Sequence, residues 1–185
     1  MIAGRGRERL VILDRDGVIN EDSDAYIKSP AEWIPIPGSL EAIARLTRAG
    51  FRIFVLTNQS GIARNYFDER VLKAIHEGML SAIEAHGGHI EAILHCPHGP
   101  GDACDCRKPL PGLFRALSQR IGIDLQGAPA IGDSHRDLVA ARAVGASPIL
   151  VRTGKGLRTL AAHPEPGCPV CDDLSAAVDL ILDQG

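Results

Sequence analysis

Short apolar runs rich in branched side chains recur along this chain, and most of them end in polar residues or glycine. Between them lie longer segments in which apolar residues repeat every three or four positions. Runs of the first kind indicate buried β-strands, and segments of the second kind indicate amphipathic helices. We predict strands at residues 10–14, 51–56, 90–94, 128–131 and 148–151, with a short edge strand at 170–171.

The predicted helices occupy the gaps between these strands. They cover residues 39–49, 68–85, 111–121, 137–143 and 174–182. Gly50 is expected to end the first helix, and Asp68 is suited to cap the start of the second. His76 is expected among the exposed positions of that second helix. The alternation of strand and helix predicts an α/β fold, a three-layer, Rossmann-like, mostly parallel sheet with helices on both faces. In such folds ligands bind beyond the carboxyl ends of the strands.

Length and composition are those of an ordinary globular enzyme. The 185 residues are 45% hydrophobic and 23% charged, which predicts a single domain over residues 1–185 with a substantial core. The net charge of −3 and the 4% of aromatic residues argue against a nucleic-acid partner. No apolar run has membrane-spanning length, and no signal-peptide stretch follows the basic start. We expect a cytoplasmic enzyme and, since no interface helix is obvious, a monomer.

Polar residues gather at the carboxyl ends of three predicted strands. Asp14 and Asp16 end the first, residues 57–60 follow the second and Asp133 follows the fourth, while residues 107–108 (Arg-Lys) lie on a connecting loop. These ends share one edge of a parallel sheet. The set suits phosphoryl transfer, in which one carboxylate attacks phosphorus, a second moves a proton and cations neutralise the phosphoryl oxygens. Mg²⁺ is the usual partner of such neighbouring carboxylates. Two aspartates one residue apart also occur in simple polar turns.

The motifs around these residues resemble those of the haloacid-dehalogenase superfamily of phosphatases. Residues 14–17 (Asp-Arg-Asp-Gly) match its first motif, Thr57-Asn58 its second, Lys108 its third and residues 132–137 (Gly-Asp-Ser-His-Arg-Asp) its fourth. The chain is similar to the branch of heptose-bisphosphate and histidinol-phosphate phosphatases at residues 13–20, 57–64, 96–98, 104–109 and 150–154. The resemblance covers nearly the whole chain and implies a haloacid-dehalogenase-like fold.

The resemblance also implies a role for each matching residue. Asp14 is the nucleophile and a magnesium ligand, Asp16 is the general acid/base and gives its backbone carbonyl to the metal, and Asp133 is the third protein ligand. The residues that hold the phosphoryl group are Thr57, Arg107 and Lys108. Those that contact substrate are Asn58, Gln59, Ser60, Asp22, Tyr26 and Ser134. Ser134 stands where the family often has lysine. For Asp137 we expect capping or support of the metal loop rather than direct ligation.

A second cluster of metal-binding residue types lies between the third strand and the third helix. Its members are Cys96, His98, Cys104 and Cys106. Three thiolates and one imidazole suit tetrahedral Zn²⁺, and the proline and glycine between them leave little apolar content on which the loop could fold. We expect a structural zinc at residues 96–106 that orients residues 107–108; reduced thiols in a flexible loop are the alternative. Cys168 and Cys171 show no second half of a zinc site, and their role stays open.

No segment is long enough for a large cap domain, since the connection that leads to residue 39 has only about twenty residues. The resemblance implies a Mg²⁺-dependent phosphatase that acts on the 7-phosphate of heptose 1,7-bisphosphate through an aspartyl phosphate, in the supply of heptose for lipopolysaccharide. Histidinol phosphate is the alternative substrate, because Glu21, Asp22 and Asp24 could receive its amine. A hypothesis of another class is a catalytically inactive phosphosugar-binding module, which would be expected to lack Asp14 or Asp16.

Overall fold

The computed structural model describes residues 9–184. In this part of the chain one sheet contains the strands β1 (Leu10–Leu13), β2 (Arg52–Asn58), β3 (Ala92–Cys96), β4 (Pro129–Gly132), β5 (Ser147–Val151) and β6 (Val170–Cys171). The helices are α1 (Ser39–Arg48), α2 (Glu69–Ala85), α3 (Gly112–Ile121), α4 (His135–Arg142), α5 (Gly156–Ala162) and α6 (Leu174–Asp183), with a 3₁₀ helix, η1, at Pro30–Glu32. The predicted α/β class is confirmed.

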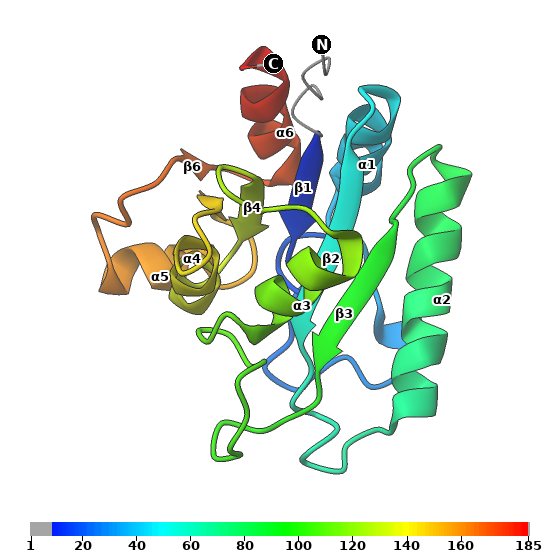
Figure 1. Cartoon of the computed structure of the whole chain (residues 1–185). Helices are drawn as coiled ribbons and strands as arrows, with labels where there is room; N and C mark the ends of the chain where they lie inside the picture. The colour runs from blue at the N-terminus through cyan, green and yellow to red at the C-terminus, as the bar shows by residue number, and fades with distance from the viewer. Residues whose placement is uncertain (1–8, 185) are drawn as a thin grey trace.

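The sheet is parallel throughout, in the order β3-β2-β1-β4-β5-β6. Ile12 of β1 lies beside Phe54 of β2 on one side and Ala130 of β4 on the other. The chain therefore extends the sheet from β1 in one direction and then returns to extend it in the other. Such a reversal opens a crevice at the carboxyl ends of the central strands. Figure 1 shows the loops that follow β1, β2 and β3 gathered at the lower end of the molecule.

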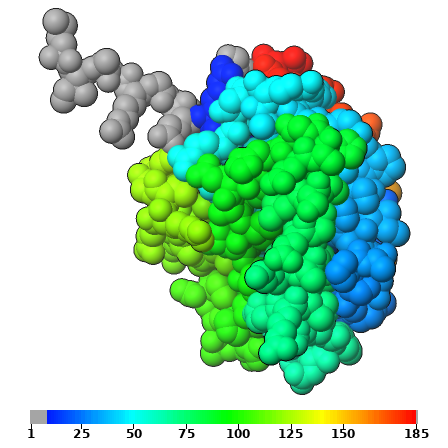
Figure 2. Space-filling model, turned by 90° about the vertical axis from the view of Figure 1, so that its right-hand side faces the viewer, coloured from blue at the N-terminus to red at the C-terminus, as the bar shows by residue number. Residues whose placement is uncertain are grey.

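Both faces of the sheet are hydrophobic, because successive side chains of a strand point to opposite sides. Val11 and Leu13 belong to the core beneath α1, α2 and α6. Leu10 and Ile12 belong to the core beneath α3 and α4. Burial on both faces explains why β1 is a continuous apolar run rather than an alternating one. In Figure 2, α2 forms the outside of one face and the segment before α1 lies beside it.

The sequence pattern misses some features of the helices. It does not predict η1 or α5, and only Gly156 and Thr159 of α5 are buried, so no apolar periodicity marks that helix. α4 begins at His135, two residues before the predicted start, because Ser134 is its N-cap. His76, expected to be exposed, is half-buried on α2. The short edge strand at 170–171 is confirmed as β6.

The connection between β1 and α1, residues 14–38, contains η1 and isolated bridges that pair Asn20 with Asp16 and Pro35. It contains no helix or strand besides η1, which agrees with the minimal cap that the sequence predicts. Across residues 9–184, no helix combines the length and the apolar character needed to cross a membrane.

Candidate active site

Three carboxylates meet at the carboxyl ends of β1 and β4. Asp14 follows β1, Asp133 follows β4, and Asp137 lies in the first turn of α4. All three are buried, and each offers an oxygen that lies within 4.8 Å of the other two. Negative charges at this distance repel one another, so cations must balance them. These three residues and Lys108 are called the carboxylate site below.

Lys108 supplies one of the balancing cations. Its side chain is 2% exposed, and its Nζ lies 2.9 Å from Asp14 Oδ1 and 2.7 Å from Asp137 Oδ1. It also donates to the carbonyl of Leu56 at 2.8 Å, so three acceptors surround the three N–H groups of the ammonium. Burial disfavours the charged ammonium, but Asp137 and Asp14 outweigh that effect and raise the pKa of Lys108. One ammonium among three carboxylates still leaves the site short of positive charge.

Burial and the neighbouring negative charges raise the pKa of two carboxyl groups of this site. Burial raises the pKa of Asp14 to about 6, against the opposing effect of Lys108. Burial, together with the charges of Asp137 and Asp14, raises the pKa of Asp133 to about 8. For Asp137 burial acts in the same direction, but Lys108 and Arg136 outweigh it and the pKa is lowered. Asp14 and Asp133 are therefore the pair that a divalent cation would relieve, and their oxygens suit Mg²⁺.

Two glycines let the backbone close around Asp133. A Cβ at Gly17 or Gly154 would lie 2.1 or 2.3 Å from Asp133 Oδ2, and both glycines have positive φ, +80° and +56°. Both the lack of space and the left-handed backbone therefore require glycine. The backbone N–H of Lys155 donates to the same Oδ2 at 2.7 Å, and the Thr159 hydroxyl donates to the Asp133 carbonyl at 2.9 Å. The loop after β5 is thus part of the carboxylate site.

The side chain of Asp16 lies outside the three-carboxylate cluster and is held by hydrogen bonds of its own. Arg15 donates to both Asp16 oxygens at 2.8 to 3.0 Å. Asn20 donates to Oδ1 at 2.9 Å, and Gln59 donates to Oδ2 at 2.8 Å. Burial alone would raise the pKa of Asp16, but Arg15, Asn20 and Gln59 together lower it. A fixed carboxylate separate from the metal cluster is suited to proton transfer.

The residues after β2 connect the carboxylate site to the neighbouring loops. The Thr57 hydroxyl accepts a hydrogen bond from Gln59 Nε2 at 2.9 Å. The side chain of Asn58 exchanges two hydrogen bonds with the backbone of Lys108, at 3.0 and 3.1 Å. Asn58 was predicted to contact substrate, and the structure shows that it also fixes the Lys108 segment.

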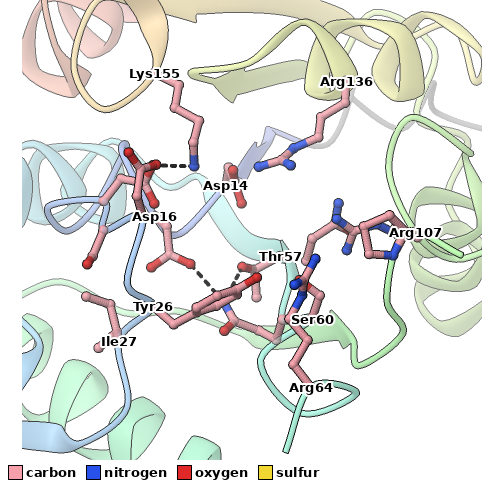
Figure 3. Close-up of a pocket in the computed structure, with 16 residues that line it drawn as sticks. Asp14, Asp16, Tyr26, Ile27, Thr57, Ser60, Arg64, Arg107, Arg136 and Lys155 are labelled. Carbon is pink, nitrogen blue, oxygen red and sulfur yellow. Dashed lines mark hydrogen bonds and ion pairs between the residues drawn. The ribbon is translucent and has the colours of Figure 1, made fainter. Parts of the chain in front are cut away.

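A pocket of about 220 Å³ opens beside these residues (Figure 3). Lys155 and Arg136 project into it from one wall, and Arg107 and Arg64 come from the opposite side. It is lined by Asp14, Asp16, Asp22, Ser23, Asp24, Tyr26, Ile27, Thr57, Asn58, Gln59, Ser60, Arg64, Pro100, Arg107, Arg136 and Lys155. The structure therefore brings nearly all the predicted catalytic and substrate residues to one cavity. Lys108, Asp133 and Ser134 are buried beyond its lining.

The acidic residues of the loop after β1 are paired with cations. Asp22 is ion-paired with Lys155, and Asp24 lies 3.2 Å from Arg158. The ring of Tyr26 lies 5.1 Å from that of Tyr66, at the edge of the same pocket. The negative charge that this loop offers to a ligand is consequently largely matched by the protein itself.

Ser134, which was predicted to contact substrate, takes part in the capping of α4. Its backbone N–H donates to Asp137 Oδ2 at 3.0 Å, and its hydroxyl donates to the same oxygen. This interaction caps α4, so the capping expected for Asp137 is observed. A short hydroxyl used in this way cannot reach the pocket as a lysine at the same position would.

Arg136 and Lys155 also line the pocket; the sequence leaves open whether Arg136 contacts substrate or solvent and gives no role for Lys155. They follow the carboxyl ends of β4 and β5, so the rule that placed Asp14 would have placed them too. Arg136 Nε is buried and has no hydrogen-bond partner among the described residues. The guanidinium points towards Asp14 in Figure 3, where it adds positive charge above the floor of the pocket.

The second cluster predicted to bind metal also comes together. The donor atoms of Cys96, His98, Cys104 and Cys106 all lie within 4.8 Å of one another. The Sγ atoms of Cys96 and Cys106 are 3.1 Å apart, and His98 Nδ1 lies 3.3 Å from Cys106 Sγ. Ligands about 2.3 Å from a tetrahedral zinc ion lie roughly 3.8 Å apart, so the four donors fit one ion. Burial and Cys106 raise the pKa of the Cys96 thiol to about 12, a cost that a bound cation would remove. Residues 96–106 are called the thiolate loop below.

Backbone groups of the thiolate loop hold residues of the pocket. Arg107 Nη1 donates to the carbonyl of His98 at 3.1 Å. The backbone N–H of Gln59 donates to the carbonyl of Cys96 at 2.7 Å. The shape of this loop therefore affects the position of the Arg107 guanidinium. It also affects the backbone of Gln59, whose side-chain amide donates to Asp16. Cys168 and Cys171 are free thiols that belong to neither metal cluster found in the described chain.

A family profile, two related sequences and one solved structure all match this chain, and their descriptions agree with one another. The HAD-hydrolase-like family profile matches residues 105–177. The D-glycero-beta-D-manno-heptose-1,7-bisphosphate 7-phosphatase of Bordetella bronchiseptica is 54% identical over 177 residues, which cover 95% of this chain and 99% of that protein. The protein of the same name from Pseudomonas aeruginosa is 54% identical over 173 residues, with coverages of 94% and 97%. A crystal structure of D,D-heptose 1,7-bisphosphate phosphatase from B. bronchiseptica, complexed with magnesium and phosphate, matches with a TM-score of 0.92 and 54% identity, over 96% of this chain and 99% of that one.

Proposed function

The chain belongs to the haloacid-dehalogenase-like family of heptose-1,7-bisphosphate 7-phosphatases, and on this premise we propose that it hydrolyses the 7-phosphate of D-glycero-β-D-manno-heptose 1,7-bisphosphate. One observation carries the proposal. The carboxylate of Asp14 borders a pocket that also contains a fixed second carboxylate, Asp16, and three arginines. The β-anomer is chosen because the relatives from B. bronchiseptica and P. aeruginosa carry it in their names.

In the first half of the reaction, a carboxylate oxygen of Asp14 attacks phosphorus and the bond from phosphorus to the sugar oxygen breaks. Asp16 donates a proton to that oxygen, so the sugar leaves as an alcohol rather than an alkoxide. Thr57 lines the pocket near Asp14, and Lys108 lies behind the lining with its ammonium 2.9 Å from the Asp14 carboxylate. Both are close to where negative charge develops on the phosphoryl oxygens. Asp14 then carries the phosphoryl group as an aspartyl phosphate.

In the second half, a water molecule attacks phosphorus and the bond to Asp14 breaks. Asp16, now a carboxylate, takes the proton from that water, which releases phosphate and restores the Asp14 carboxylate. The hydrogen bonds that lower the pKa of Asp16 suit it to act as this base. The approach of a phosphate dianion opposes that effect by repulsion and favours the protonated acid needed in the first half.

We propose Mg²⁺ as the catalytic cofactor, held by Asp14, Asp133 and the backbone carbonyl of Asp16. The raised pKa values of Asp14 and Asp133 support it, because these carboxyls are buried beside other carboxylates and a cation would stabilise their charged forms. The magnesium and phosphate in the B. bronchiseptica structure support it as well. When bound, the ion supplies positive charge to the phosphoryl oxygens.

We propose structural Zn²⁺ at Cys96, His98, Cys104 and Cys106. All four positions of a tetrahedral ion are then taken by protein atoms, so no position remains for substrate. The hydrogen bond from Arg107 to the His98 carbonyl links the ion to the pocket. Loss of zinc would lower the activity by displacing Arg107 and Gln59, without a direct effect on the reacting atoms.

The charges of the pocket favour a substrate with two phosphates over histidinol phosphate. Arg64, Arg107 and Arg136 line the cavity and can receive a second anionic group. Asp22 and Asp24, which were expected to attract an amine, are instead ion-paired with lysine and arginine. A cationic substrate would have to compete with those pairs.

The experiment is phosphate release from a panel that contains both anomers of the heptose bisphosphate, heptose 7-phosphate and histidinol phosphate, with Mg²⁺ present. The highest kcat/KM is expected for the β-bisphosphate. A preference for histidinol phosphate would overturn the substrate assignment. Binding of the bisphosphate without any turnover would favour the inactive phosphosugar-binding module. Cytoplasmic location and a monomeric state stay predictions.

A further inference from the structure

A fully buried arginine connects the proposed acid/base to a histidine of α2. The Arg15 side chain is 0% exposed. Its Nε and Nη2 donate to the Asp16 carboxylate at 2.8 to 3.0 Å. Its Nη1 lies 3.2 Å from Nε2 of His76. The guanidinium is therefore held at both ends, with Asp16 on one side and His76 on the other.

His76 is the acceptor in this contact. Burial, together with the charge of Arg15, lowers its pKa to about 3, so the ring is neutral and the lone pair of Nε2 faces the guanidinium. The other titratable groups around the ring are Asp16 and His95, whose ring lies 6.2 Å away edge-on. His95 Nε2 lies in turn 3.0 Å from a carboxylate oxygen of Glu69.

We propose that His76 is a positioning residue for the phosphatase reaction, which fixes Arg15 so that Arg15 holds the Asp16 carboxylate where it can protonate the leaving sugar oxygen. The inference rests on the proposed function, since it needs Asp16 as the acid/base. A planar guanidinium has no free rotation between two partners once both ends are bound. Without the acceptor on α2, a buried N–H loses its partner and the guanidinium turns to recover one. Catalysis is sensitive to misplacement of about 1 Å, so the loss reaches the proton-transfer step.

A purely structural role of the same contact predicts a different result. A buried arginine between a carboxylate and an imidazole could serve only the stability of the fold. In that case loss of the contact would lower kcat/KM to the same extent for every substrate. If His76 acts through Asp16, the loss depends on whether the leaving group needs a proton.

The test compares two leaving groups in variants of His76. H76F replaces the imidazole by an aromatic ring that lacks the acceptor. H76L is a second variant without an acceptor, for use if the H76F protein does not fold. H76Q restores an acceptor near the position of Nε2. Each is assayed for kcat/KM with the heptose bisphosphate, whose alcohol needs a proton, and with p-nitrophenyl phosphate, whose phenolate leaves without one. Acetyl phosphate replaces the aryl ester if the wild type does not hydrolyse that ester.

With the sugar substrate we expect H76F or H76L to lose roughly 10- to 100-fold in kcat/KM, a part of the contribution that general acid catalysis makes. With p-nitrophenyl phosphate we expect a change below about threefold, because the leaving group needs no acid. H76Q recovers most of the activity on the sugar. H86F, at the exposed C-terminal end of the same helix, is the matched control and leaves both substrates unchanged.

Equal losses on both substrates, no loss on the sugar, or failure of H76Q to recover activity on the sugar would each overturn the positioning role. Failure of the proposed function is a separate outcome, since the wild-type enzyme would then not hydrolyse the bisphosphate at all.

Discussion

The carboxylate site and the thiolate loop are neighbours, since Asn58 at the end of β2 pairs with Cys96 at the end of β3, but they are built by opposite means. The strands and the hydrophobic cores beneath them place the carboxylates, and all three are buried. The thiolate donors lie on a loop in which only Cys96 and Gly99 are buried. The sheet can therefore hold hard oxygen ligands in place without an ion, whereas the shape of the loop depends more strongly on its own ligands.

This contrast separates what each metal should do. An ion at the carboxylate site should matter for turnover and for the balance of charge, and it can exchange. An ion in the thiolate loop should matter for order in the loop and should be retained.

The largest effect is expected from Asp14→Asn. Turnover should fall by at least about 10⁴-fold, because the amide cannot form the acyl phosphate and the reaction loses its nucleophile. The free energy of unfolding should stay the same or rise, because a buried carboxylate with a raised pKa is removed. Phosphate release and chemical denaturation measure the two quantities. Retained activity in this variant would exclude Asp14 as the nucleophile.

Removal of zinc should have the next largest effect, and mainly on stability. Cys106→Ser, or chelation followed by metal analysis, should lower the melting temperature by about 5–10 °C, which corresponds to roughly 2–3 kcal/mol for a chain of this size. kcat should fall by about tenfold, since Arg107 and Gln59 lose the backbone partners that hold them. A protein that melts unchanged after verified loss of zinc would contradict the structural role.

Removal of magnesium should produce a smaller change in stability that depends on pH. The folded-state pKa values of Asp14 and Asp133, about 6 and about 8, lie above the ordinary value of 3.8. The folded protein thus binds more protons than the unfolded chain, so without a divalent ion the contribution of these groups falls as pH rises from about 4 to about 8. Added Mg²⁺ should raise the free energy of unfolding more at pH 8 than at pH 5, by an amount on the order of 1–2 kcal/mol, and the melting temperature should rise accordingly. Thermal melts at both pH values with and without Mg²⁺ decide this, and an equal shift at the two would contradict it.

The smallest effect is expected from the cysteines outside the thiolate loop. Cys168→Ser and Cys171→Ser should leave the zinc content unchanged and should each alter the free energy of unfolding by less than about 1 kcal/mol, because both side chains are partly exposed and outside the cluster. Cys104→Ser is the matched variant that should lose the metal. Metal analysis of the three proteins compares them, and zinc loss in either outer variant would place those thiols in the site.

The difference between the carboxylate site and the thiolate loop also explains which features of the fold and of the site could be predicted from the sequence. Strands buried on both faces, such as β1, leave continuous apolar runs, and the strand-end rule then brings Asp14 and Asp133 together without any distance information. The thiolate loop was found from the type and spacing of its residues alone.

The contacts that escaped prediction depend on where a polar side chain points. Arg15 lies between two predicted catalytic residues, but only the structure shows that it is fully buried against α2. His76 was expected among the exposed positions of α2, but it is half-buried and contacts Arg15. Ser134 was expected at the substrate, and the sequence did not show that its hydroxyl donates to Asp137 in the cap of α4. Such choices are decided by partners far apart in sequence, which periodicity does not report.

The central claim is that the Asp14 carboxylate carries the phosphoryl group between the substrate and water. Its most direct test is to mix the enzyme with the heptose bisphosphate, quench in acid during the first turnover, reduce with borohydride and map the reduced residue by mass spectrometry. An acyl phosphate is reduced in this way to homoserine, and the account predicts homoserine at position 14 alone, formed before free phosphate appears. Homoserine elsewhere, or phosphate release with no modified residue at any time, would contradict it.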